Sequence, residues 1–325
     1  MAITTTSPTG YEVRRLSAAL GAEIIGIDLR QPLDAATVSA LRRTWLENQV
    51  LLFRGQEFGA AEQIRFSEYF GPVDDYPLVH FRHPDNAKLM LLTNAPVKGT
   101  TSTSRNAGAR WHTDLSFTAR PATASLLHAQ RIPEIGGDTM FANQYLAFDK
   151  LSPLLREIIE PLHAVHELFS GRSEPLDARM LEMKASHPRV AHPMVRIHPE
   201  TRRPALYVNP SITTEIVGLT SEESAGLLDF LRGHSVREEF LYRHVWRKGD
   251  FIMWDNRCLL HMAVQDYSND QVRLMHRTTI TGEPCGRVIE QPGGAKPQGA
   301  AQPASQSAAQ SALDDAAQRL VKDNS

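Results

Sequence analysis

The chain has 325 residues, of which 42% are hydrophobic and 22% charged, and these fractions are ordinary for a soluble globular protein. Its 35 basic and 37 acidic residues give a formal net charge of -2, which gives no electrostatic reason to expect binding to nucleic acid or to an anionic membrane. The two cysteines make no disulfide framework, residues 1–10 lack the pattern of a signal peptide, and no stretch approaches the roughly 18 uninterrupted apolar residues of a membrane-spanning helix. These observations predict a cytoplasmic globular protein.

The first part of the chain predicts short strands with two helices between them. The predicted elements are strands within 11–29, a helix over 34–48, a strand over 49–55, a helix over 60–70 and a strand over 88–93. Asp34 is a suitable N-cap for the first helix, and Gly71-Pro72 ends the second. Residues 97–108 are mostly Gly, Ser, Thr and Asn, and we expect either a lid beside a site or a plain surface loop.

The rest of the chain predicts more strands, and with them the fold class. The predicted elements are strands over 115–118 and 122–129, a helix over 143–151, a second helix from Ser152-Pro153, an irregular insertion over 168–189, a hairpin of 192–198 with 205–208, a helix over 221–232, and strands over 249–256 and 273–281. Many short strands bracketed by turns predict an α+β, mainly β protein with a double-stranded β-helix (jelly-roll, cupin-like) core and helical decoration. We expect a flexible N-terminus over 1–10, one domain over 11–290, and a disordered Ala/Gln/Pro-rich tail over 291–325.

A histidine and an aspartate two residues apart, His112 and Asp114, are the first candidates for a catalytic site. In an extended chain, side chains two residues apart point to the same face, so both can reach one point. With the distant His261 they make a 2-His-1-carboxylate facial triad, which binds a non-haem Fe(II) and leaves other positions open for co-substrate and oxygen. The pattern therefore predicts an oxygen-activating iron enzyme.

The same His-x-acid spacing occurs at two other places, so the motif alone is weak. His83-Pro84-Asp85 and His198-Pro199-Glu200 carry a proline between the candidate ligands. Proline is confined to sheet edges and turns, so both segments read as loop corners. His112 instead precedes the run 115–118, which reads as a strand. A histidine and an aspartate that merely cap a turn remain the alternative interpretation of 112–114.

Two arginines on the last predicted strand are the second indication of a site. Arg273, Met275 and Arg277 share one face, because side chains alternate along a strand. Burial of two guanidinium groups without anions is very costly. Their partners are either chain carboxylates such as Asp266, or the anionic groups of two ligands, a dicarboxylate co-substrate and an anionic substrate.

Together, these motifs resemble the taurine dioxygenase (TauD/TfdA-like) family of Fe(II)/2-oxoglutarate-dependent dioxygenases. The matching segments are Trp111-His112-Thr113-Asp114, Gly136-Gly137-Asp138-Thr139, Asp255-Asn256-Arg257 before His261, Arg273 to Arg277, His192-Pro193 and Leu206-Tyr207-Val208-Asn209. They occur in the family's order and span nearly all of the predicted domain. The resemblance implies a jelly-roll core in which His112, Asp114 and His261 bind Fe(II), and Thr139 and Arg273 hold the distal carboxylate of 2-oxoglutarate.

The resemblance also implies a substrate side of the site. The residues it assigns there are Arg277, His80, Tyr207, Gly108, Leu115 and Leu168. Arg277 matches the arginine that binds the substrate anion, which is a sulfonate in taurine dioxygenase. Gly108 stands where that enzyme has a polar asparagine, and Leu168 replaces a phenylalanine. We therefore expect a larger or more apolar anion than taurine: an alkyl sulfate, a bulkier sulfonate or an aryloxyalkanoate.

The implied reaction consumes O2 and 2-oxoglutarate and gives succinate and CO2. The substrate is hydroxylated at a carbon next to a heteroatom, and the leaving group is lost. Two other function classes use the same residues: a zinc hydrolase on the same three ligands, and a non-catalytic jelly-roll protein that binds an organic anion. The family resemblance implies a homo-oligomer, a dimer or tetramer, and the net charge predicts neither a nucleic-acid nor a membrane partner.

Several further residues are interpreted as supporting the structure. The two histidines outside the triad that attract attention, His192 and His276, are expected to be structural. Trp111 and Trp254 are expected to pack beside the site. Asp255 and Asn256 are expected to orient His261 from behind.

Overall fold

A computed structural model describes residues 4–75, 79–95, 108–170, 175–268 and 270–289. These residues belong to one compact unit that spans Met1–Ile289. The predicted tail over 291–325 and nearly all of the predicted loop over 97–108 lie outside the described residues. No helix in the described part of the chain is long and apolar enough to cross a membrane.

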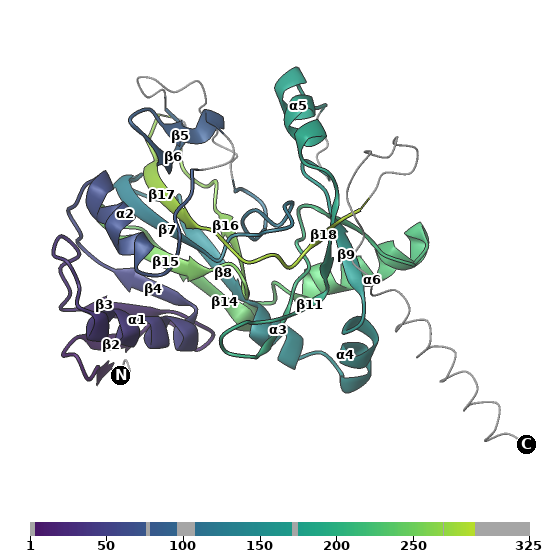
Figure 1. The fold of residues 1–325 in the computed structure, drawn as a ribbon, viewed down its shortest axis with the longest axis horizontal. Coiled ribbons are helices and arrows are strands. Elements are labelled where there is room, and N and C mark those ends of the chain that lie inside the picture. Colours follow the sequence, from purple (N-terminus) through teal and green to yellow (C-terminus); the bar gives the residue numbers. More distant parts are fainter. Residues whose placement is uncertain (1–3, 76–78, 96–107, 171–174, 269, 290–325) are drawn as a thin grey trace, which may run out of the picture. The chain divides into compact units, whose positions relative to one another are not determined.

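A nine-stranded sheet forms the larger part of the core (Figure 1). Its strands are, in spatial order, β1 (Thr4–Thr6), β2 (Glu12–Arg15), β3 (Ala22–Ile25), β4 (Val50–Phe53), β15 (Phe251–Asp255), β7 (Ala124–Arg131), β17 (Leu274–Ile280), β6 (Asn86–Thr93) and β5 (Arg82–His83). Neighbouring strands are antiparallel except for β3 and β4, which are parallel. The central strand β15 comes from late in the chain, so the sheet joins both ends of the domain.

Helices α1 (Ala35–Asn48) and α2 (Ala60–Glu68) cover one face of this sheet. Asp34 caps α1 as predicted, since its carboxylate accepts a hydrogen bond from the backbone N–H of Thr37 at 2.7 Å. The fully buried rings of Trp45 and Phe66 fill the layer between helices and sheet together with Phe53. This apolar layer packs the two helices onto one face of the sheet, and the other face of the sheet packs against the rest of the core.

A three-stranded sheet packs on that other face and closes the double-stranded β-helix. It consists of β14 (Leu241–His244), β8 (Thr139–Asn143) and β16 (Leu259–Ala263), with β8 in the middle. Phe141 and Leu259 of this sheet pack against Trp254 and Met275 of the nine-stranded sheet in one buried cluster. The predicted jelly-roll core with helical decoration is confirmed.

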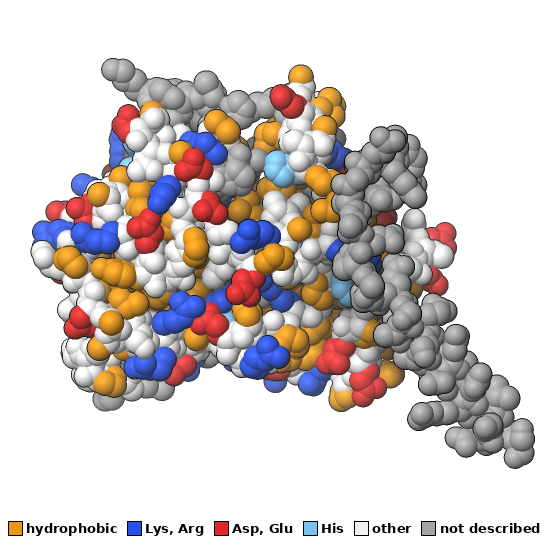
Figure 2. Space-filling model, viewed as in Figure 1, with side chains coloured by type: hydrophobic (Ala, Val, Ile, Leu, Met, Phe, Trp, Pro, Cys, Tyr) orange, Lys and Arg blue, Asp and Glu red, His pale blue; other side chains and the backbone are white. Residues whose placement is uncertain are grey.

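A second set of strands and helices extends the core (Figure 1). The strands are a four-stranded sheet of β13 (Thr213–Ile216), β9 (His163–His166), β10 (Val190–Pro193) and β18 (Arg287–Val288), and the hairpin β11 (Val195–Ile197) with β12 (Pro204–Leu206). The helices are α3 (Gln144–Asp149), α4 (Pro153–Ile159), α5 (Ala178–Ser186) and α6 (Ser221–His234), with short 3-10 turns η1 (Val79–Phe81) and η2 (Glu238–Phe240). Ser152 caps α4 and Thr220 forms a capping box with Glu223 on α6, as predicted. On the face shown in Figure 2, acidic and basic side chains are interspersed rather than segregated.

Three predicted local structures differ from those observed. Residues 115–118 form a turn and not a strand, because Leu115 adopts a left-handed backbone conformation (φ 56°) and its carbonyl accepts a hydrogen bond from the N–H of Thr118. The predicted irregular insertion contains α5, whose N-terminus Asp177 caps. Within the segment predicted to be flexible, Thr4–Thr6 instead forms β1 and pairs with β2.

Candidate active site

Two segments far apart in sequence bring the predicted triad together. His112 and His261 form an isolated antiparallel bridge: the N–H of each donates to the carbonyl of the other, at 3.0 Å from His112 and 2.8 Å from His261. His261 lies in β16, whose Ala263 N–H donates to the carbonyl of Gly108 at 2.8 Å. The backbone thus places both imidazoles side by side, with ring centroids 4.1 Å apart.

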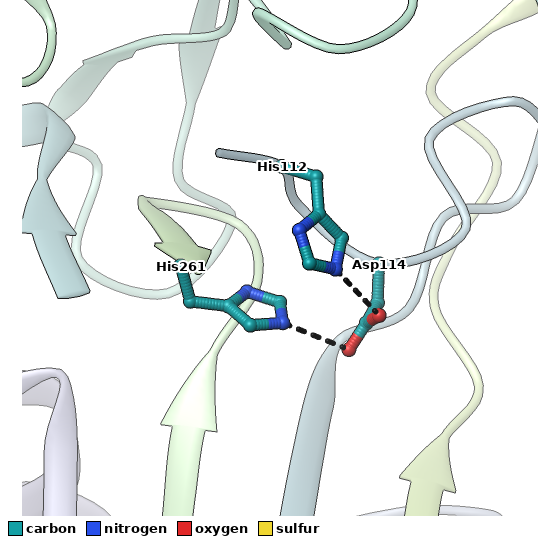
Figure 3. A group of neighbouring side chains, drawn as sticks. All are labelled: His112, Asp114 and His261. Atoms are coloured by element: carbon teal, nitrogen blue, oxygen red, sulfur yellow. Dashed lines mark ion pairs between the residues drawn. The ribbon is translucent and has the colours of Figure 1, made fainter. Parts of the chain in front are cut away.

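The side chains of the triad converge on one point (Figure 3). The Nε2 atom of His112 lies 3.8 Å from Oδ1 of Asp114, and Nε2 of His261 lies 3.7 Å from Oδ2. One ligand atom from each of the three residues lies within 4.8 Å of the others. The side chains of Asp114 and His261 are 6% and 7% exposed, whereas that of His112 is 22% exposed, so the group is reached from the His112 side.

A hydrogen bond of His112 decides which of its ring nitrogens faces the centre. Nδ1 of His112 lies 2.7 Å from the carbonyl oxygen of Arg110 and therefore carries the proton, which leaves the lone pair on Nε2. Burial lowers the pKa of His112, although Asp114 acts in the opposite direction. Burial, followed by the proximity of His112, lowers the pKa of His261 well below its ordinary value. Both imidazoles are therefore neutral at pH 7, as metal ligation requires.

Three further residues orient the Asp114 carboxylate. The Ser125 hydroxyl on β7 donates to Oδ2 at 2.6 Å, and Nη1 of Arg277 lies 3.0 Å from Oδ1. The side-chain oxygen of Asn256 accepts the Asp114 backbone N–H at 3.3 Å, and its amide donates to Ser125. Burial by itself raises the pKa of Asp114, but Arg277 and the two histidines outweigh it and hold that pKa well below its usual range.

The donor set fits a divalent transition metal. Two neutral imidazole nitrogens and one ionised carboxylate point to a common centre from one side, and hydrogen bonds behind them fix the His112 ring and the carboxylate. Among the described residues, Nδ1 of His261 has no hydrogen-bond partner. The alternative in which His112 and Asp114 merely cap a turn does not explain the convergence of His261.

Both members of the predicted carboxylate-binding pair are buried: Thr139 is the first residue of β8, and Arg273 directly precedes β17. Nε of Arg273 donates to the carbonyl of Gly137 at 3.0 Å. Burial lowers the pKa of Arg273 to about 10, with Tyr267 and Asp138 opposing, so the guanidinium remains charged at pH 7. Among the described residues, no carboxylate oxygen lies within 4.0 Å of it.

The alternative ion-pair partner for the arginines, Asp266, is used elsewhere. Its carboxylate lies 2.9 Å from Nη2 of Arg243 and accepts the N–H of Gly137 at 2.8 Å. The predicted alternation along the last strand is observed, since Arg273, Met275 and Arg277 are buried while Leu274 and His276 are only partly buried. Arg277 has a chain carboxylate after all, but it belongs to Asp114 rather than to Asp266.

The residues predicted for the substrate side are found in different settings. Gly108 (φ +75°) lies against the site, since a Cβ there would meet Cε1 of His112 at 3.3 Å. Leu115 lies in the turn after Asp114 and is partly buried. Leu168 follows β9 and is buried. His80 lies in η1, and its side chain is outside the described residues.

Tyr207 lies in a buried aromatic cluster beside the site. Its ring stacks on His166 at 5.8 Å and meets the edge of His192 at 5.6 Å, and the Arg196 guanidinium lies 5.1 Å from its centroid. Nε2 of His192 in turn binds the carbonyl of Ser116, in the turn after Asp114, at 2.8 Å. His192 therefore links the Tyr207 cluster to the turn that follows Asp114.

Two predicted supporting roles are wrong. Asp255 was expected to orient His261, but its carboxylate binds Arg257 and His198 instead. Asn256 supports Asp114 rather than His261. Sequence reasoning also missed Ser125, whose hydroxyl binds the Asp114 carboxylate. The available signal is a polar residue inside a buried strand, and this signal does not reveal which group the serine faces.

Comparison with known proteins agrees with this geometry. Residues 12–279 match the family described as "Taurine catabolism dioxygenase TauD, TfdA family". The chain is 34% identical over 281 residues to an alkylsulfatase of Acinetobacter baylyi, covering 84% of this chain and 85% of the relative. It is 32% identical over 289 residues to an alpha-ketoglutarate-dependent sulfate ester dioxygenase of Pseudomonas putida, covering 86% and 92%.

A solved structure supports the same relationship. The crystal structure of AAD-2 in complex with Mn(II) and N-oxalylglycine is 30% identical, with a TM-score of 0.74, over 86% of this chain and 99% of that one. The resemblance predicted from the sequence motifs is confirmed over most of the chain. This protein belongs to the TauD/TfdA family of dioxygenases.

Proposed function

We propose that this dioxygenase hydroxylates a small organic anion, with a sulfate ester as the leading substrate class, at the carbon next to the ester oxygen. The observation that carries the proposal is the combination of a converging His112/Asp114/His261 group with a buried Arg273 that has no carboxylate partner among the described residues. A metal centre beside a cation that needs an anion fits an enzyme that holds a dicarboxylate co-substrate on a metal.

The metal ligands are His112, Asp114 and His261. Fe(II) bound there activates O2, with 2-oxoglutarate as the co-substrate that is converted to succinate and CO2. The chain's part is to present two neutral imidazoles and one oriented carboxylate. Ser125 donates a hydrogen bond to that carboxylate and Asn256 accepts one from the Asp114 backbone N–H, and support of this kind tunes metal affinity.

The co-substrate carboxylate is held by Arg273 and Thr139. A guanidinium is planar and binds carboxylates in bidentate fashion, and the threonine hydroxyl adds one hydrogen bond. Burial strengthens both interactions because it removes competing water. A zinc hydrolase would need neither residue, which is why this assignment favours the dioxygenase.

The substrate anion is placed by Arg277, with Gly108, Leu115, Leu168, Tyr207 and His80 as the other substrate-side residues. Arg277 already lies against the metal ligand Asp114, so an anion bound to it brings the adjoining carbon close to the metal. Gly108 packs against His112, and its lack of a side chain leaves no polar group at this position to bind the substrate. The names of two relatives, an alkylsulfatase and a sulfate ester dioxygenase, support sulfate as the anion.

The atoms of this reaction balance. One oxygen atom of O2 enters succinate and the other is inserted into the C–H bond next to the ester oxygen. The hydroxylated carbon then expels sulfate and loses its hydroxyl proton, which gives an aldehyde. The products from a primary alkyl sulfate are therefore an aldehyde, sulfate, succinate and CO2.

The first test is anaerobic absorbance of the protein with Fe(II) and 2-oxoglutarate. A weak visible band is expected for the wild type and for Arg30→Ala, a control at an exposed ion pair with Asp28. The Arg273→Ala variant is expected to need roughly a hundredfold more 2-oxoglutarate, because a charge-assisted bidentate pair is lost. Absence of the band at saturating iron and 2-oxoglutarate in the wild type would refute the dioxygenase site.

The second test is the substrate itself. Succinate formation is measured with hexyl sulfate, hexanesulfonate and phenoxyacetate at equal concentrations. We expect the highest kcat/KM with hexyl sulfate and a matching yield of aldehyde and sulfate. Preference for phenoxyacetate or the sulfonate would leave the dioxygenase intact and reassign its substrate class.

Two other expectations extend this proposal. We propose that the enzyme works in the cytoplasm and as a homo-oligomer, a dimer or tetramer, as the family resemblance implies. Size-exclusion chromatography with light scattering tests the oligomeric state, and a monomer at working concentration would contradict it.

A further inference from the structure

We propose that Trp246 is a positioning residue for 2-oxoglutarate: its indole N–H fixes the Thr139 hydroxyl so that the hydroxyl proton points to the co-substrate carboxylate. The inference rests on the proposed function, in which Thr139 and Arg273 hold that carboxylate. Trp246 itself contacts no ligand in this arrangement and acts only through Thr139.

A single hydrogen bond carries the inference. Nε1 of Trp246 lies 3.0 Å from Oγ1 of Thr139, and both residues are buried, at 5% and 3% exposure. An indole nitrogen can only donate, so the threonine oxygen must accept. Among the described residues, no group accepts the hydroxyl proton of Thr139. The proton is therefore held ready for an acceptor that the protein does not provide, such as a carboxylate oxygen beside Arg273.

The indole is itself held in place by a buried network. His244 on β14 lies opposite Thr139 in the strand pairing, and its ring packs edge-on against Trp246 at 4.6 Å. The two nitrogens of His244 bind Tyr242 at 2.9 Å and Asp250 at 3.1 Å, and Asp250 pairs with Arg54 at 2.7 Å. Because the Trp246 ring is held in place, its N–H restricts the rotation of the Thr139 hydroxyl before the co-substrate binds. This restriction lowers the entropic cost of co-substrate binding.

Binding of N-oxalylglycine to the Mn(II) protein tests this inference without turnover. The dissociation constant is measured by calorimetry for wild type, Trp246→Phe, Thr139→Val and the double variant. We expect Trp246→Phe to weaken binding about fivefold and Thr139→Val about tenfold, the range of one buried hydrogen bond. The double variant should bind no more weakly than Thr139→Val, because Trp246 has nothing to position once the hydroxyl is gone.

A matched control separates positioning from packing. Trp45 is also fully buried, and its Nε1 has no hydrogen-bond partner among the described residues, so Trp45→Phe removes an indole without removing such a bond. We expect its affinity to stay within about twofold of the wild type. In activity assays, Trp246→Phe should raise the KM for 2-oxoglutarate and leave kcat nearly unchanged.

The outcomes are distinguishable. Lack of N-oxalylglycine binding to the wild-type Mn(II) protein would refute the co-substrate site itself. Unchanged affinity in Trp246→Phe, or an equal loss in the Thr139→Val background, would overturn only the role of Trp246. If Trp246→Phe does not fold, the indole ¹⁵N resonance of Trp246 is measured instead. N-oxalylglycine should shift this resonance in the wild type and leave it in place in Thr139→Val. A shift in both proteins would overturn the inference.

Discussion

Among the described residues, two groups of histidine, aspartate and a third donor converge closely enough to hold a metal ion, and we propose that only the first of them does so. The first is His112, Asp114 and His261, and the second is His198, Asp255 and Cys258. By the spacing of their ligand atoms the two are equivalent, since each set lies within 4.8 Å. The two clusters differ in their hydrogen bonds.

The backbone partner of Nδ1 decides the role of each histidine. In His112 this nitrogen faces the Arg110 carbonyl and is protonated, so Nε2 presents a lone pair to the centre. In His198 the same nitrogen accepts the N–H groups of Glu200 and Thr201, so Nε2 carries the proton and donates it to Asp255 at 3.0 Å. The carbonyl behind the His112 ring therefore leaves a lone pair facing the centre, whereas the amides behind the His198 ring make its Nε2 a donor.

The aspartates differ in the same way. Asp255 receives two guanidinium nitrogens of Arg257, at 2.8 Å and 2.6 Å, and Arg257 extends the network to Glu200 and Arg42. Its oxygens are thus saturated by donors. Asp114 also meets an arginine, but both of its oxygens still face an imidazole at 3.7 to 3.8 Å, which leaves room for an ion between them. The second cluster is an ion network that joins the hairpin to the core.

The largest expected effect comes from breaking the first cluster. In His261→Ala, we expect Fe(II) binding to be lost and turnover to fall on the order of 10³-fold or more, because the metal carries the chemistry. Metal content and succinate formation measure this effect. The matched variant His198→Ala should keep its metal content and its turnover per folded molecule. Retention of iron in His261→Ala would contradict the assignment of the triad.

Breaking the second cluster should instead damage the fold. Asp255→Ala leaves the Arg257 guanidinium buried without its bidentate partner, and a buried ion pair that loses one member costs about 3–5 kcal/mol. Urea unfolding of the metal-free protein measures the loss. A change of less than about 1 kcal/mol would show that Glu200 alone satisfies Arg257 and that the network is redundant.

A smaller effect is expected from the group that orients Asp114. Ser125→Ala removes the hydroxyl that donates to Oδ2 at 2.6 Å, and residues in this position typically change metal affinity by about 10–100-fold. Competition with a metal chelator measures the affinity. The control is Ser67→Ala, which removes an equally buried hydroxyl that binds Gln63 and Thr278, away from the triad. Equal metal affinity in both variants would show that Arg277 and Asn256 suffice to orient the carboxylate.

The comparison also explains which parts of the site were predictable from the sequence. The two-residue spacing of His112 and Asp114 and the alternation that buries Arg273 and Arg277 are local properties of an extended chain, so the sequence contains them. The contact of Asn256 with Asp114 spans 142 residues, and Ser125 reaches Asp114 across an 11-residue segment that includes a turn, so no local pattern encodes either contact.

The dependence on distant hydrogen bonds also explains where the predictions of local structure are wrong. Residues 115–118 have the composition of a strand, but the Thr113 hydroxyl and the Asp114 N–H both donate to Asn256, and a turn with Leu115 left-handed follows. His198-Pro199-Glu200 was correctly expected to lie at a turn. Its histidine nevertheless reaches Asp255, 57 residues away, and becomes buried. Neither outcome follows from propensity, because tertiary hydrogen bonds decide both.

The smallest expected effect is the pH dependence of stability in the second cluster. Burial by itself raises the pKa of Asp255, but Arg257 and His198 outweigh burial and hold that pKa well below its ordinary value. A depressed pKa adds stability above the pKa of the unfolded chain, about 3.9, and this stability is lost as the pH falls. Between pH 5 and pH 3, Asp255 should therefore account for a loss of roughly 1 kcal/mol.

Urea unfolding of metal-free wild type and Asp255→Asn at both pH values measures this loss. The variant is less stable throughout, but its stability should fall less steeply with pH, and parallel profiles would contradict the pKa direction. Asp114 has a depressed pKa as well, so Asp114→Asn should flatten the profile in the same sense. Only Asp114→Asn should also abolish metal binding, because the neutral amide can no longer offer an ionised oxygen to the centre. If Asp255→Asn and Asp114→Asn change the acid sensitivity equally but only Asp114→Asn loses metal binding, the first cluster is a metal site and the second is an ion network.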